Sequence, residues 1–126
     1  MIQAAVMTHH AACPKSTVAV APSEPYVTRG PTKVVVGLYV QGGAFIPNCP
    51  QEPRGPEGGT VTLSGRGGKI VARETLAAAG RLFVLPVAPG HYTISAKIAN
   101  GVRLRPVSVT VRKGYTVRHD LFEDVP

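Results

Sequence analysis

Two cysteines, Cys13 and Cys49, are the residues of this chain that could form a covalent cross-link. An even number of cysteines permits one disulfide. Closing a loop of roughly 36 residues would stabilise the fold by about 3–4 kcal/mol, and the bond requires an oxidising compartment. We expect this disulfide, and two unpaired thiols are the alternative. A third alternative makes Cys13, which follows Ala11 and Ala12, a lipid-attachment site, although His10 stands where an aliphatic residue is expected.

The four histidines could in principle bind a metal or move protons. His9 and His10 lie near Cys13, and imidazole and thiolate suit zinc, but no fourth ligand follows at a fixed spacing. We therefore expect a solvated tail there, with no metal and no cofactor. His91 is expected in an exposed turn. His119 lies between apolar neighbours on its strand, which favours a half-buried, hydrogen-bonded structural role over that of a general base, so we expect no catalytic residue.

Basic residues dominate the second half of the chain. The net charge is +7, and no Asp or Glu occurs between Arg81 and Arg118. One patch could contain Arg103, Arg105, Arg112, Lys113 and Arg118, and it could attract a cell-wall glycan, a lipid head group or a nucleic acid. Proteins that bind single strands usually interleave aromatic residues, and Tyr115 is the one aromatic nearby, so no specific nucleic-acid partner is expected. A solvated strand face, the more common origin of such charges, is the alternative.

The elements that must position these residues are short strands. The chain has 14 glycines and 12 prolines, which cluster between apolar runs as turns do between strands. Apolar residues alternate in 60–64, which predicts that Val61 and Leu63 point inward, and the same period recurs in 92–98. The remaining predicted strands cover 33–40, 69–75, 83–87, 102–111 and 115–122.

Turn residues connect these strands. Ala88-Pro89-Gly90 suits a type II turn, so residues 80–98 are predicted to form a hairpin. Asn100-Gly101 predicts a second hairpin, and Pro106 marks a bulge or an edge in the strand that follows. Seven strands at intervals of roughly 8 to 12 residues favour an all-β fold, a single antiparallel seven-stranded β-sandwich with Greek-key connections.

The chain is expected to contain one domain. Residues 1–31 carry four prolines and are predicted to be an extended or disordered tail, and residues 32–126 are predicted to form the sandwich. Residues 41–59 form the longest loop inside that domain. No run of about 18 apolar residues occurs, so no transmembrane segment is expected.

Three segments carry a resemblance to a known family. They are Gly-Gly-Thr-Val-Thr-Leu (58–63), Gly-Arg-Leu-Phe-Val-Leu-Pro-Val-Ala-Pro-Gly-His-Tyr-Thr-Ile (80–94) and Val-Ser-Val-Thr-Val-Arg-Lys-Gly-Tyr-Thr-Val (107–117). Together they resemble the carboxypeptidase regulatory-like and Cna-B-like (transthyretin-like) domains of small secreted actinobacterial proteins and lipoproteins. The resemblance implies a prealbumin-like or Ig-like sandwich, secreted or in the cell envelope, that serves binding, adhesion or spacing.

The resemblance also brings two covalent chemistries into view. Some Cna-B-like domains form an isopeptide bond, for which Lys33 and Asp120 are in plausible places, but the catalytic acid expected near Ser95 or Ala96 is absent. The transthyretin-like hydroxyisourate hydrolases end in Tyr-Arg-Gly-Ser, whereas this chain ends Leu-Phe-Glu-Asp-Val-Pro. We therefore expect a non-enzymatic module whose partner is a protein or an anionic cell-envelope polymer. A basic anion-binding domain is the alternative, and a hydrolase is the less favoured one.

Overall fold

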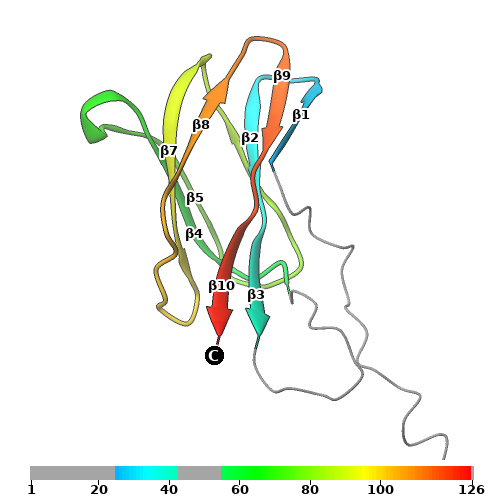
Figure 1. Ribbon diagram of the computed structural model, residues 1–126, viewed down its shortest axis with the longest axis vertical. Helices are drawn as coiled ribbons and strands as arrows, with labels where there is room; N and C mark the ends of the chain where they lie inside the picture. Colours follow the sequence, from blue (N-terminus) through cyan, green and yellow to red (C-terminus); the bar gives the residue numbers. More distant parts are fainter. Residues whose placement is uncertain (1–24, 43–54, 126) are drawn as a thin grey trace, which may run out of the picture.

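The computed structural model describes residues 25–42 and 55–125, and these residues form an all-β fold (Figure 1). The strands are β1 (Tyr26–Arg29), β2 (Lys33–Val36), β3 (Leu38–Gly42), β4 (Gly59–Ser64), β5 (Ile70–Leu76), β6 (Phe83–Pro86), β7 (Gly90–Ile98), β8 (Val107–Val111), β9 (Tyr115–Arg118) and β10 (Leu121–Val125). A short 3-10 turn, η1 (Arg66–Gly68), joins β4 to β5.

The strands build two layers. One sheet has the order β1-β9-β2-β6, and the other has the order β5-β4-β7-β8. The pair β10-β3 extends the first layer, because β3 continues β2 and β10 continues β9 with the same relative register. Figure 1 shows β4, β5, β7 and β8 on one side of the molecule and β1, β2 and β9 on the other.

One hydrophobic core fills the space between the layers. Val34 and Phe83 are fully buried on the first sheet, and Val61, Leu63 and Ile94 are fully buried on the second. Burial alternates residue by residue along β4, as the sequence predicts. The inward positions expected on β7 are also confirmed, since Ile94, Ala96 and Ile98 are all in the core. The side chains at the alternate positions must therefore point away from the core.

The hairpin predicted for residues 80–98 is wrong. β6 pairs with β2 in the first sheet, whereas β7 pairs with β4 and β8 in the second. The Pro-Gly turn is therefore a corner between layers. β6 and β7 are not hydrogen-bonded to each other. Their apolar side chains pack in the same core from opposite sheets.

The prediction that all strands pair antiparallel is wrong at two places. β2 runs parallel to β9, and β3 runs parallel to β10. The described residues also form ten strands where the sequence predicts seven. Two of the additional strands arise because one long pair is interrupted at Gly37 on one side and at His119 and Asp120 on the other. The third, β1, lies in residues assigned to the tail and pairs with β9.

One predicted turn and one predicted irregularity are confirmed. In the Asn100-Gly101 turn, the Gly101 amide donates to the Ile98 carbonyl, and Gly101 has a φ of 99°. Lys97 pairs with Arg103 and Ile94 with Val107, so three steps along β7 match four on the returning strand. That extra residue confirms the irregularity predicted at Pro106.

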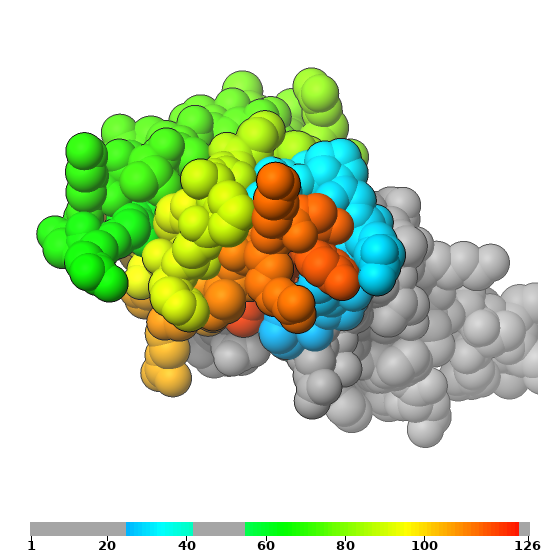
Figure 2. Space-filling view, turned by 90° about the horizontal axis from the view of Figure 1, so that it is seen from above, coloured from blue at the N-terminus to red at the C-terminus, as the bar shows by residue number. Residues whose placement is uncertain are grey.

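Connections between strands form one end of the molecule. Figure 2 shows the end where the β1–β2 and β8–β9 connections lie side by side, with the β4–β5 turn projecting at the left. The Gly30 amide donates to the Gly114 carbonyl across these two connections. No helix among the described residues is long and apolar enough to cross a membrane.

Candidate functional site

The outward side of the sheet β5-β4-β7-β8 carries polar side chains at almost every position. Strand register places Thr60 between Thr75 and Lys97, and Thr62 between Arg73 and Ser95. We call this surface the hydroxyl face, and its members are Thr60, Thr62, Ser64, Arg73, Thr75, His91, Thr93, Ser95, Lys97, Arg103, Ser108 and Thr110. On the strands, these residues alternate with residues that face the core, and Arg103 joins the face through an isolated bridge to Lys97.

Three cations gather at one end of the hydroxyl face. The side chains of Arg73, Lys97 and Arg103 are exposed. The backbones of Lys97 and Arg103 form an antiparallel β-bridge, which places the two residues side by side. The Arg73 Nε donates a hydrogen bond of 3.3 Å to Thr62 Oγ1, which holds the guanidinium over the neighbouring strand. A shallow depression of about 370 Å³ lies among these side chains and is also lined by Thr60, Thr75 and Ser95.

Two hydroxyl groups at this end of the hydroxyl face lie within hydrogen-bonding distance of each other. The Oγ1 atoms of Thr60 and Thr75 share a hydrogen bond of 2.9 Å. Each hydroxyl can donate one hydrogen bond and accept two, so capacity for a bound ligand remains. This end of the sheet therefore combines positive charges with hydroxyl groups that can form directional hydrogen bonds.

The acidic residues of the described chain lie elsewhere. Four acidic side chains are described, Glu57, Glu74, Asp120 and Glu123, and none lies on the hydroxyl face. Glu74 is on β5 but pairs with Val61 on the core side, and its Oε1 accepts a hydrogen bond of 2.8 Å from the Val84 amide. Because none of the four described carboxylates lies beside the three cations, the charges described at this end of the sheet favour anions.

The opposite end of the hydroxyl face has a second depression, of about 520 Å³, next to the β4–β5 turn. The ring Nδ1 of His91 and the hydroxyl of Thr110 are 2.8 Å apart there, and Arg66 reaches the same depression. His91 is exposed, as the sequence predicts. No group of three His, Cys, Asp or Glu residues is arranged to hold a metal ion in residues 25–42 and 55–125.

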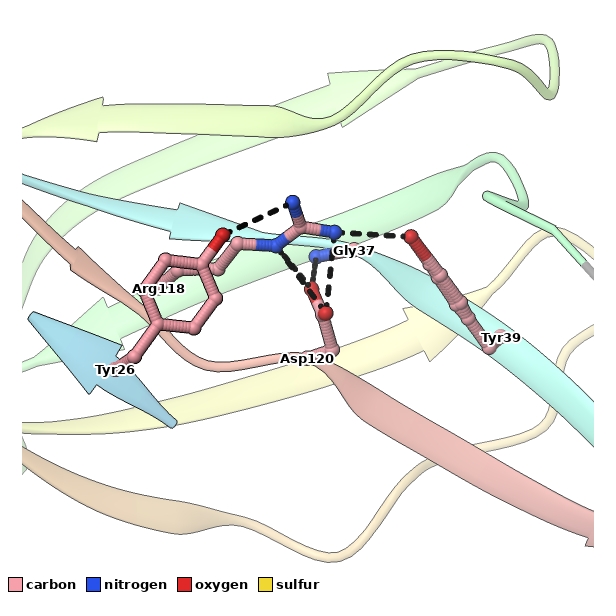
Figure 3. A network of polar contacts seen from close by, with 5 residues as sticks. All are labelled: Tyr26, Gly37, Tyr39, Arg118 and Asp120. Atoms are coloured by element: carbon pink, nitrogen blue, oxygen red, sulfur yellow. Dashed lines mark hydrogen bonds and ion pairs between the residues drawn. The ribbon is translucent and has the colours of Figure 1, made fainter. Parts of the chain in front are cut away.

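A buried ion pair lies in the other layer (Figure 3). Arg118 Nη2 is 3.1 Å from Asp120 Oδ2, and the Asp120 side chain is fully buried. The Arg118 guanidinium also donates to Tyr39 Oη at 3.1 Å and to Tyr26 Oη at 3.5 Å. Asp120 Oδ1 accepts a hydrogen bond of 2.8 Å from the Gly37 amide.

This network explains why two long strands are interrupted. At Gly37 the Asp120 carboxylate replaces a main-chain carbonyl as the acceptor, so the regular ladder stops and resumes as β3 with β10. A Cβ at Gly37 would lie 2.7 Å from Asp120 Oδ1 and 2.9 Å from Tyr39 Oη, so any larger residue would displace the side chains of this network. The network therefore fixes the joint between the two halves of the first layer.

Burial and the charges of the network shift the pKa values of Arg118, Tyr39 and the neighbouring His119. Burial is the largest single influence on the pKa of Arg118 and lowers it, but the hydrogen bond to Asp120, the charge of Asp120 and the contacts with Tyr26 and Tyr39 together outweigh burial, so the pKa is raised. Burial raises the pKa of the Tyr39 phenol, and the Asp120 carboxylate adds to that effect. Burial lowers the pKa of His119, against a smaller upward influence of Asp120. His119 is half-buried, as predicted.

The five basic residues expected to form one patch are separated. Arg118 points into the ion pair, and Arg112 and Lys113 lie in the β8–β9 turn. Arg103 is on the hydroxyl face, and Arg105 follows it in the connection to β8. Only Arg103 therefore joins the cluster of cations described above.

Other members of the candidate site escaped the sequence analysis. Arg73 and Lys97 were not grouped with Arg103, because they come from different strands and meet only once the strand order is known. Arg29, predicted to be in the tail, lies outside the candidate site, where it and Arg112 are 5.7 Å and 5.2 Å from the centroid of the Tyr115 ring. The available signal was the outward alternation of Thr, Ser, Lys and Arg along the predicted strands.

Of the covalent chemistries considered for this fold, the described residues bear on the isopeptide bond between Lys33 and Asp120. Lys33 pairs with Thr116, four residues before Asp120, and the Asp120 carboxylate is already bound to Arg118 and to the Gly37 amide. Cys13, Cys49, His9 and His10 lie outside the described residues. Comparison with protein-family models, with curated proteins and with solved structures gives no match to this chain.

Proposed function

We propose that this protein is a non-enzymatic β-sandwich module, secreted or held in the cell envelope, that binds an anionic polymer through the hydroxyl face. The two facing sheets and their shared core support a prealbumin-like or Ig-like sandwich. One observation carries the functional proposal. Arg73, Lys97 and Arg103 converge among hydroxyls, and no carboxylate among the described acidic residues lies on that surface.

A binding role fits this surface better than a catalytic one. Nucleophilic catalysis needs a hydroxyl activated by a base that a third group orients. On the hydroxyl face the His91–Thr110 contact lies beside no described carboxylate. The groups with shifted pKa values, Tyr39, Arg118 and His119, belong to the other layer.

The proposal is tested by retention on immobilised heparin, a linear polyanion. The K97Q/R103Q variant removes two charges from the hydroxyl face, and R81Q/K113Q removes two exposed charges from other connections as a matched control. If each exposed contact contributes about 0.5–1 kcal/mol, the first variant should bind five- to thirty-fold more weakly. The control should elute close to the unmodified protein.

Salt gives an independent measure of the number of contacts. With roughly 0.7 counterions released per contact, three contacts predict a slope of about −2 for the logarithm of affinity against the logarithm of salt concentration. A fourfold increase in salt should then weaken binding about sixteenfold. Flow-through at low salt, or equal losses in the two double variants, would contradict binding through this face and would leave adhesion to a protein as the remaining role.

A further inference from the structure

The three cations of the hydroxyl face follow a line that crosses the strands. Arg73 is on β5, Lys97 is two strands away on β7, and Arg103 is paired with Lys97 on the far side. From the spacing of strands and the two-residue offset, the Cα atoms of Arg73 and Lys97 are about 12 Å apart, and those of Arg73 and Arg103 are about 16 Å apart. An extended ligand can contact all three more readily than one compact anion.

The groups between the cations are hydroxyls. Thr60, Thr62 and Ser95 lie in the middle of this line, on β4 and β7, and Thr75 lies beside them on β5. Hydroxyl side chains both donate and accept hydrogen bonds, so they suit a ligand that itself presents alternating hydroxyls and charged groups. A chain of sugars with carboxylate or sulfate substituents has this composition.

The described residues place no aromatic side chain in the depression at this end. The residues that line the depression around Arg73, Lys97 and Arg103 include no aromatic ring. Tyr115 carries guanidinium groups against its ring at a different place, in the first layer. Unpaired nucleobases are usually held by stacking on exposed aromatic rings, so this end of the sheet is poorly suited to single-stranded nucleic acid.

We propose that the ligand of the hydroxyl face is a linear anionic polysaccharide that crosses β5, β4 and β7 and contacts Arg73, Lys97 and Arg103 together. This inference rests on the proposed function and specifies the ligand. The cations bind the carboxylates or sulfates, and the threonine and serine hydroxyls bind the sugar hydroxyls between them. A chain shorter than the line of cations loses part of these contacts.

The test is calorimetric titration of the full chain at low salt with four probes. They are a heparin-derived disaccharide, a heparin-derived octasaccharide, inorganic sulfate and a short duplex DNA. We expect the octasaccharide to bind about tenfold or more tightly than the disaccharide and than the duplex. Sulfate should compete only as added salt does. The K97Q/R103Q variant should lose most of the advantage of the octasaccharide, while R81Q/K113Q should keep it.

The outcomes distinguish a failure of the proposed ligand, a linear polysaccharide, from a failure of the proposed binding function. Equal affinity for disaccharide and octasaccharide, or strong competition by sulfate, would overturn the linear ligand in favour of a compact anion. Tighter binding of the duplex would overturn the polysaccharide in favour of nucleic acid. In both cases a loss confined to K97Q/R103Q would preserve the hydroxyl face as the binding surface. Absence of binding by every probe would refute the proposed function itself.

Discussion

Asp120 offers the sharpest test of how the fold is held together. Its carboxylate is fully buried and accepts hydrogen bonds from the Gly37 amide and from the Arg118 guanidinium. Replacing it with alanine leaves both donors without this partner. The Asp120→Ala variant should therefore lose stability far beyond what a change at the surface costs.

The size of the loss follows from how much water can replace the missing carboxylate. Removing one partner of a fully buried pair costs about 3–5 kcal/mol. The Arg118 side chain keeps 21% of its surface exposed and can turn partly to solvent, so we expect a value near 3 kcal/mol. Asp120→Asn keeps an acceptor for the Gly37 amide but loses the charge, which predicts a loss of about 1.5 kcal/mol.

The assay is equilibrium unfolding in urea followed by far-ultraviolet circular dichroism. Glu123→Gln, which removes one acidic charge from β10, is the control and should change stability by less than about 0.5 kcal/mol. The reasoning is refuted if the alanine and asparagine variants lose equal amounts, or if both match the control. In either case the carboxylate would not be the acceptor on which the interrupted strands depend.

Three further predictions concern other parts of the chain. Burial lowers the pKa of His119, so folding stability should be full above pH of about 6.5 and fall as the pH drops below that value, and in urea unfolding at several pH values His119→Gln should flatten that decline. Gly59 has a φ of 154° and a Cβ there would meet the Lys97 carbonyl, so Gly59→Ala should cost about 2–3 kcal/mol in thermal unfolding; a loss below about 1 kcal/mol would count against this strain. Alkylation of the unfolded protein before and after reduction should label Cys13 and Cys49 only after reduction, as intact mass reports; labelling without reductant would exclude the disulfide.

Local alternation was enough to predict which side chains are buried. A strand has a period of two, so inward positions such as Val61 and Ile94 can be recognised without knowledge of any partner strand. The Asn100-Gly101 turn was predictable for a similar reason, because its conformation depends on the two residues that form it. These features are set within a few residues of sequence.

Strand pairing was not predictable in the same way. A Pro-Gly turn such as that before Gly90 permits either a hairpin or a corner between layers, and only the packing of Phe83 and Ile94 in a common core decides between them. Parallel pairing of β2 with β9 joins residues more than 80 positions apart, for which the local sequence carries no signal. The interruption at Gly37 depends on a carboxylate equally far along the chain.

The candidate site was missed for a related reason. Arg73, Lys97 and Arg103 become neighbours only because β4 lies between β5 and β7 and because the returning strand folds back on β7. A grouping by proximity in sequence instead combined Arg103 with Arg118, whose guanidinium is bound to Asp120. Outward alternation identifies the right residue types, but strand order is needed to place them on one surface.

The most direct test of the binding surface is a nuclear magnetic resonance titration of the isotope-labelled protein with the heparin-derived octasaccharide. The account predicts that the largest amide shift changes fall on Thr62, Arg73, Lys97 and Arg103 and on the residues next to them. Amides of the β8–β9 turn around Arg112 and Lys113 should change little. Largest changes in that turn, with the hydroxyl face unaffected, would contradict the account.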